Sequence, residues 1–220
     1  MAIASTANTK NEAPDRERLR RLKAQPRQPG EASFFWYEPA FRCEAVKVLP
    51  GEYFVDDQEI AIMTTLGSCI AACLWDRTSG IGGLNHFMLP GGVGAGDSGR
   101  YGAYAMELLI NEMMKRGALR TSLEAKVFGG GQVIKGMDTM NIGERNTRFV
   151  LDYLHAEGIP IVSKDVLDVF PRKVCFLPVG GRAMVKRLSS SNIATIVAQE
   201  RAAAKQIVPT AADRKAVELF

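Results

Sequence analysis

Short segments in which apolar residues alternate with polar ones, or run together, predict strands from residue 44 onward. The segments with this pattern are 44–49, 58–63, 70–75, 81–89, 125–128, 160–163, 173–178 and 182–188. Apolar residues at helical spacing predict helices over 101–116 and 144–156, and an alanine-rich stretch after a serine run predicts a third over 193–206. Because strands outnumber helices and hairpin-type connections dominate, we predict an α+β fold.

Composition divides the chain into three parts. Residues 1–40 contain few large apolar residues apart from an aromatic cluster at 34–37, so we expect them to form a disordered N-terminal extension. We expect the aromatic cluster to pack this extension onto the domain. A transient helix over 15–23 is the regular structure expected within the extension. We expect residues 41–208 to form a single domain and residues 209–220 to form a loose C-terminal tail.

The bulk properties are those of an ordinary globular protein, since 46% of the 220 residues are hydrophobic, 24% are charged and the net charge is +4. The basic residues near the N-terminus are interpreted as a solvated arm, so no nucleic-acid partner is expected. The sequence has no apolar run of about 18 residues and no apolar core of a secretory signal near its start. We therefore expect a cytoplasmic protein, without direct membrane insertion, whose four cysteines are free thiols.

One predicted hairpin places a cysteine and one of only two histidines on neighbouring strands. The apolar runs 70–75 and 81–89 flank the polar turn 76–80, which is the pattern of a β-hairpin. If the turn is centred between residues 77 and 78, Cys69 lies directly opposite His86, with Cβ atoms roughly 4.5–5.5 Å apart. A thiol within reach of an imidazole base is the arrangement of a cysteine nucleophile.

Small and hydroxyl-bearing residues accompany this pair. The backbone N–H groups of Ser68 and Cys69 follow a glycine and are candidates for stabilising an oxyanion. The hydroxyl of Thr64 or Thr65 could accept the imidazole N–H and fix its tautomer. Four glycines are expected to clear room for a substrate chain or to shape the rim of the site, namely Gly82, Gly83, Gly129 and Gly130.

Other interpretations of these residues stay open. A cysteine in an apolar strand and a histidine between apolar neighbours are commonly core residues. Cys69, Cys73 and His86 could form part of a zinc site, but the sequence lacks the paired CxxC pattern, so no metal is expected. The glycine-rich segments 91–99 and 129–131 lack the spacing of nucleotide-binding loops, so no cofactor is expected.

Six motifs follow one another between about residues 46 and 188: LGSCIAACLWD, GIGGLNHFMLP, RYGAYAMELLINEMMKRGA, KVFGGG, IGERNTRFVLDYLHAEGIPI and PRKVCFLPVGGRAMV. In this order they resemble the CheD family of chemoreceptor glutamine deamidases. The resemblance implies a cofactor-independent protein-glutamine glutaminase, a hydrolase that converts selected glutamines on the cytoplasmic helices of chemotaxis receptors to glutamate. It also implies layered, mixed and hairpin-rich β-sheets packed against two or three helices, similar to the toxin-deamidase fold.

The family's catalytic set is a cysteine, a histidine and a threonine. By motif position, the resemblance assigns the cysteine to Cys69 and the histidine to His86. The threonine lies six residues before the cysteine in some members, where this chain has Met63, and five before it in others, where this chain has Thr64. We favour Thr64 and keep Thr65 as its rival.

The resemblance also implies partners. The cytoplasmic domain of chemotaxis receptors is the first, and a CheC-type phosphatase is a second in some organisms. Two alternative functions remain open, a non-enzymatic adaptor that binds receptors and a methylesterase in which the same thiolate attacks a glutamyl methyl ester.

Overall fold

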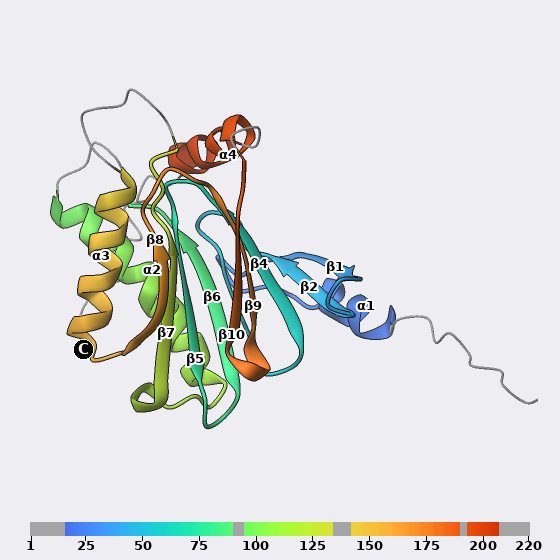
Figure 1. Cartoon of the computed structure of the whole chain (residues 1–220). Coiled ribbons are helices and arrows are strands. Elements are labelled where there is room, and N and C mark those ends of the chain that lie inside the picture. Colours follow the sequence, from blue (N-terminus) through green and yellow to red (C-terminus); the bar gives the residue numbers. More distant parts are fainter. Residues whose placement is uncertain (1–15, 90–94, 134–141, 190–192, 207–220) are drawn as a thin grey trace, which may run out of the picture.

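The described residues form two five-stranded β-sheets, and two long helices pack on the outer face of one of them (Figure 1). A computed structural model describes residues 16–89, 95–133, 142–189 and 193–206. The first sheet has the strand order β1 (Phe34–Glu38), β2 (Cys43–Lys47), β4 (Ile60–Leu66), β9 (Arg172–Leu177) and β10 (Arg182–Arg187). The second has the order β3 (Tyr53–Asp56), β6 (Ile81–Phe87), β5 (Ile70–Asp76), β7 (Leu123–Gly129) and β8 (Ile161–Val166).

The second sheet lies between two of the helices and the first sheet. The helices are α1 (Arg16–Ala24), α2 (Ala95–Lys115), α3 (Ile142–Ala156) and α4 (Ile193–Gln206), with short 3-10 turns η1 (Arg120–Ser122) and η2 (Pro178–Gly180). Helices α2 and α3 cover the outer face of the second sheet, and α4 lies at one end of the sheets (Figure 1). One apolar core joins that outer face to α2 and α3 through residues such as Leu74 and Met106. Another lies between the sheets and includes Leu84 and Phe176.

Both sheets mix parallel and antiparallel pairs. Strand β2 is parallel to β4 and β7 is parallel to β8, whereas the other neighbours are antiparallel. The α+β prediction, with layered and mixed sheets against helices, is therefore confirmed.

The β5–β6 hairpin has a different register from the predicted one. Ala71, not Cys69, lies opposite His86, so the turn is centred one residue later than expected. The Asp76 side chain sets this turn, because its Oδ1 accepts hydrogen bonds from the N–H groups of Thr78 (2.8 Å) and Ser79 (3.3 Å). Cys69 precedes β5 and belongs to the same core face as Ala71, so it reaches His86 as a diagonal neighbour.

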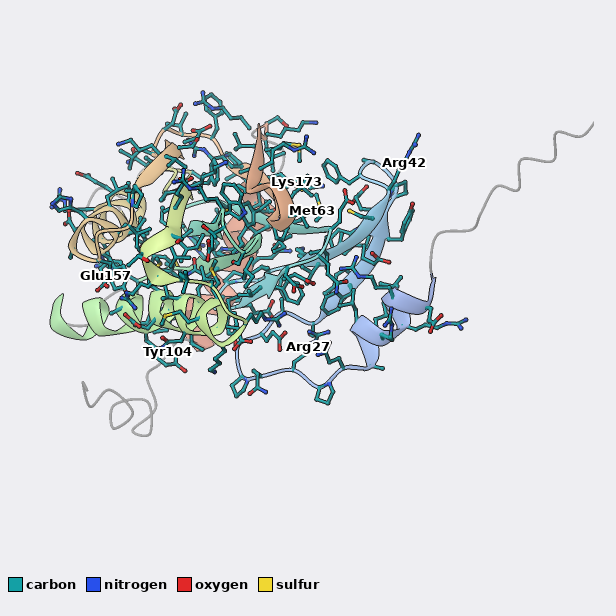
Figure 2. All side chains as sticks on the ribbon, turned by 90° about the horizontal axis from the view of Figure 1, so that it is seen from below. Arg27, Arg42, Met63, Tyr104, Glu157 and Lys173 are labelled. Carbon is teal, nitrogen blue, oxygen red and sulfur yellow. The ribbon has the colours of Figure 1, made fainter. Side chains whose placement is uncertain are left out.

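The segment before residue 41 has more regular structure than its composition predicted. Strand β1 pairs with β2 along its whole length, and Arg18 of α1 forms an ion pair with Glu44 of β2 (2.7 Å). The guanidinium of Arg27, a residue labelled in Figure 2, lies 4.5 Å from the ring centre of Phe35 in β1. These tertiary contacts supply stabilisation that the local composition does not indicate, so the aromatic cluster is a strand of the first sheet.

Two further differences concern the expected elements. Helix α2 begins at Ala95 instead of 101, since the glycines near its start had lowered its expected helix propensity. Strand β3, only four residues long, was not predicted. The expected tail 209–220 and residues 1–15 lie outside the described residues. Among the described helices, none combines the length and the hydropathy that crossing a membrane requires.

Candidate active site

Residues 67–69, called here the anion-binding loop, are held through their carbonyl groups. The N–H of Gly131 donates to the carbonyl of Gly67 (2.8 Å), and the N–H of Gly130 donates to the carbonyl of Cys69 (2.8 Å). The side-chain amide of Asn146 donates to the carbonyl of Ser68 (2.9 Å). These bonds fix the orientation of the loop, and its three N–H groups converge on one partner, which is the geometry of a backbone anion site.

The glycines after β7 make the close approach to the Cys69 carbonyl possible. Gly129 has a φ of +111°, and a Cβ added there would stand 2.2 Å from the carbonyl oxygen of Cys69. At Gly130, with a φ of +68°, a Cβ would stand 2.1 Å from the hydroxyl of Thr147. Both positions therefore require glycine, and the two residues expected at the rim form the support beneath Cys69 instead.

Asn146 was not found from the sequence. It is completely buried on α3, and its Oδ1 also accepts a hydrogen bond from the N–H of Leu89 (2.9 Å). The signal that could have found it is its spacing, since Asn146 precedes the buried Val150 and Leu154 by one and two helical repeats of four residues. A polar side chain on an apolar helix face needs buried partners, which here belong to the site.

Thr64 orients the imidazole of His86. The Thr64 hydroxyl lies 2.8 Å from His86 Nδ1 and donates to the carbonyl of Val48 (2.7 Å). Since its one proton is used on Val48, the Thr64 oxygen accepts the Nδ1–H, and Nε2 is left as the basic nitrogen. Nε2 is buried and has no hydrogen-bond partner among the described residues.

The alternative positions for the threonine lie on the other face of β4. Met63 packs with Ala45 and Cys175 in a small outer cluster, and it sits beside the strand that carries Lys173 (Figure 2). Because side chains alternate along a strand, Thr65 shares the face of Met63. Thr65 also lines the cavity beside His86, but it is the Thr64 hydroxyl that lies within hydrogen-bond distance of the imidazole.

Glu200 of α4 completes the group and was also not expected. One of its oxygens accepts hydrogen bonds from the N–H groups of Gly67 (2.8 Å) and Cys69 (3.1 Å). The other accepts from the N–H (3.0 Å) and the hydroxyl (2.7 Å) of Ser68. The N–H groups predicted to hold an oxyanion therefore hold a carboxylate, and Gly67 adds a third donor to the two expected ones.

The side chains that meet at this site are buried. Cys69 is 0% exposed, and His86 and Thr64 are each 2% exposed. Burial raises the pKa of the Cys69 thiol, and the nearby Glu200 carboxylate raises it further. Burial lowers the pKa of His86, which the negative charge of Glu200 opposes. Burial alone would raise the pKa of Glu200, but hydrogen bonds from the thiol and the loop lower it.

The cysteine, histidine and glutamate also have the donor types of a zinc site. Cys69, His86 and Glu200 each offer one atom within 4.8 Å of the other two. Cys73, the third ligand considered from the sequence, lies further along β5 opposite Leu84 and is not in this group. Because the carboxylate is already bound by N–H donors, which select an anion, we interpret the group as an anion site.

Gly82 and Gly83 do not lie at the site. Gly82 pairs with Trp75, roughly 20 Å along the strand from Cys69 at 3.3 Å per residue. A Cβ at Gly82 would stand 2.9 Å from the ring of Phe176, and one at Gly83 would stand 2.7 Å from Leu109. Close packing between layers accounts for both glycines at these positions.

Comparisons with known proteins agree with the geometry. Residues 88–187 match the family model "CheD chemotactic sensory transduction". A "Probable chemoreceptor glutamine deamidase CheD 1" of Albidiferax ferrireducens is 58% identical over 92% of this chain and 87% of its own. Proteins named "Probable chemoreceptor glutamine deamidase CheD" are 54% identical in Thiobacillus denitrificans (77% of this chain, 87% of that one) and 48% identical in Methylobacillus flagellatus (84% and 94%). The hypothetical protein YfiH of Bacillus licheniformis aligns at 10% identity and a TM-score of 0.35 over 53% of this chain and 49% of that one, which supports no conclusion.

Proposed function

This chain belongs to the CheD family, and from that premise we propose that it is a protein-glutamine glutaminase that deamidates glutamine side chains of chemotaxis receptors. One observation carries the proposal. A thiol, an imidazole with a free ring nitrogen and three converging backbone N–H groups lie together at Cys69, His86 and the anion-binding loop. These are the nucleophile, the base and the oxyanion donors that amide hydrolysis needs.

The proposed reaction has two halves. His86 Nε2 takes the proton of the Cys69 thiol, and the thiolate attacks the amide carbon of the substrate glutamine. The oxyanion then accepts hydrogen bonds from the loop, where charge develops in the transition state. His86 returns the proton to the departing ammonia, which leaves a thioester on Cys69. A water molecule deprotonated by the same nitrogen hydrolyses the thioester and releases glutamate.

Thr64 acts as a positioning residue in this scheme. By accepting the Nδ1–H of His86, its hydroxyl holds the tautomer in which Nε2 can serve as the base. No cofactor takes part, since each proton and each leaving group is handled by side chains, backbone and water.

The proposed partner is the cytoplasmic domain of a chemotaxis receptor, so we place the protein in the cytoplasm. A CheC-type phosphatase remains a candidate second partner, on the basis of the family resemblance alone. The catalytic domain is proposed to extend over residues 41–208, with α1 and β1 packed on it.

Release of ammonia and of methanol separates the enzymatic hypotheses from the adaptor hypothesis. A purified receptor cytoplasmic fragment, unmethylated or methylated, is incubated with the protein and with Cys69→Ala, and receptor binding is measured in parallel. We expect ammonia from the parent protein, none from Cys69→Ala, and equal binding by both. Methanol release in preference to ammonia would favour the methylesterase, and an ammonia signal that survives Cys69→Ala would disprove the mechanism.

A further inference from the structure

The helix that supplies Glu200 blocks the site that the mechanism needs. We propose that α4 is an autoinhibitory segment, in which the Glu200 carboxylate occupies the oxyanion site as an intramolecular mimic of the glutamate product, and that substrate gains access only when α4 leaves. This inference rests on the proposed deamidase function. It adds a regulatory element to that function, and it makes undocking of α4 a step of the catalytic cycle.

The first argument is chemical identity. Deamidation converts a glutamine side chain to a glutamate side chain, and a glutamate side chain is what the loop holds. Both Glu200 oxygens are bound, one by Gly67 and Cys69 and the other by Ser68. A carboxylate uses all four donors, whereas an amide would direct its own N–H₂ at one of the oxygen positions, meet the N–H of Ser68 and therefore bind more weakly.

The second argument is access. Helix α4 packs Ile196 and Glu200 against the site, and each is only 5% exposed. Both residues line a small cavity together with Thr64 and His86. Because Cys69 and His86 have almost no exposed surface in this state, a glutamine on another protein cannot reach the thiol while α4 is docked.

The third argument concerns the nucleophile. The Glu200 carboxylate lies within 4.8 Å of the Cys69 thiol, and its negative charge disfavours a second negative charge on the sulfur. The pKa of the thiol is accordingly raised in this state, by burial first and by Glu200 second. Docking of α4 therefore blocks the oxyanion site and also holds the nucleophile in its unreactive, protonated form.

A catalytic role for Glu200 fits the contacts less well. In a cysteine–histidine–carboxylate triad the carboxylate would orient the imidazole, but Nδ1 of His86 is already bound by Thr64. The Glu200 oxygens instead occupy the N–H groups that the substrate oxyanion must use. A carboxylate that stayed there during the reaction would exclude the transition state, so we assign it to the resting state.

Substitutions on α4 test the proposal in the full-length protein. Glu200→Ala removes the mimic, and Ile196→Ala weakens docking of the helix while leaving Glu200 unchanged. We expect each to raise kcat/KM for deamidation of a receptor fragment, and the rate of iodoacetamide labelling of Cys69, by about tenfold or more, because Glu200→Ala loses charge-assisted hydrogen bonds and Ile196→Ala loses apolar contact, and either loss weakens docking of α4. Arg201→Ala, an exposed neighbour on the same helix, is the matched control and should change neither rate. Unchanged rates in both variants, or loss of activity in Glu200→Ala with slower labelling, would overturn the proposal, the latter in favour of a catalytic Glu200.

A second variant tests the mimicry directly. In E200Q the helix presents a glutamine amide to Cys69, so the protein should deamidate itself and regain the parent sequence. Mass analysis of the peptide that spans α4 should show conversion of the amide to the acid, with activity falling toward the parent value as conversion proceeds. The double variant C69A/E200Q should keep its amide. If E200Q stays unconverted while it deamidates a receptor fragment, the mimicry is wrong and the deamidase function stands. If it converts neither, the deamidase function itself fails.

Discussion

Replacing Asn146 by alanine tests whether the anion-binding loop is held in place for catalysis. The side chain is fully buried and joins two backbone segments, donating to the carbonyl of Ser68 and accepting from the N–H of Leu89, each at 2.9 Å. Alanine removes both hydrogen bonds and leaves both backbone groups without their partner. The loop then loses one of the three contacts that fix its carbonyls.

The magnitude follows from these two bonds. A buried backbone group left without its partner costs about 1–3 kcal/mol, so the loss of both partners should lower the free energy of unfolding by about 2–6 kcal/mol. Deleting an oxyanion donor outright lowers kcat by about 10²–10³-fold. In Asn146→Ala the backbone N–H donors of the loop remain, but their orientation is less well fixed. We therefore expect a loss of about 10–100-fold in kcat.

Asn85 provides the matched control. It is also buried and also joins backbone segments, accepting from the N–H of Ala72 (3.1 Å) and donating to the carbonyl of Ala105 (3.0 Å). Its side chain points away from the face that carries His86, because neighbours on a strand alternate. Asn85→Ala should cost similar stability in urea unfolding while kcat for ammonia release stays close to the parent value. Equal losses of kcat in Asn146→Ala and Asn85→Ala would refute the reasoning and indicate a general folding defect.

Further predictions concern the imidazole. Thr64→Val should lower kcat by about tenfold, since the Nδ1–H loses its acceptor, whereas Thr65→Val should not; the opposite order would restore the rival assignment. His86→Ala should abolish ammonia release, whereas His155→Ala, at an exposed position of α3, should leave it intact. Similar losses in both variants would argue against a chemical role for His86. Burial lowers the pKa of His86 in the folded protein despite the nearby Glu200, so its contribution to stability is present above about pH 6.5 and is lost as the pH falls below that value. Urea unfolding at about pH 7 and about pH 5 should therefore show a larger loss for the parent than for His86→Asn, and parallel losses would contradict the assigned shift.

Local patterns in the sequence predict the hairpin and the face shared by Cys69 and His86, but not the register of the hairpin. The apolar runs on each side of the turn are visible, so β5 and β6 are expected nearly where they occur. The turn centre depends on the Asp76 carboxylate, which binds Thr78 and Ser79, and the hydrophobic pattern carries no information on that contact. A shift of one residue at the turn moved Cys69 from directly opposite His86 to a diagonal position.

The parts of the site that come from elsewhere in the chain could not be predicted. Glu200 binds Cys69 across 131 residues, and Asn146 binds Ser68 across 78, so no local spacing links them. What the sequence does offer is a polar residue on an apolar face. Glu200 follows Ile196 by four residues and Ile193 by seven, which places it on the apolar side of α4. Such a residue indicates that a buried partner exists, but it does not show which residue that partner is.

The central claim is that Cys69 is the nucleophile that converts receptor glutamines to glutamate. Mass mapping of a purified receptor cytoplasmic fragment, after incubation with the protein or with Cys69→Ala, tests it most directly. We predict that selected glutamine residues gain the mass change of amide-to-acid conversion with the parent protein and that none do so with Cys69→Ala. Glutamines that convert equally with both proteins, or that remain unchanged with the parent and with Glu200→Ala, would contradict the account.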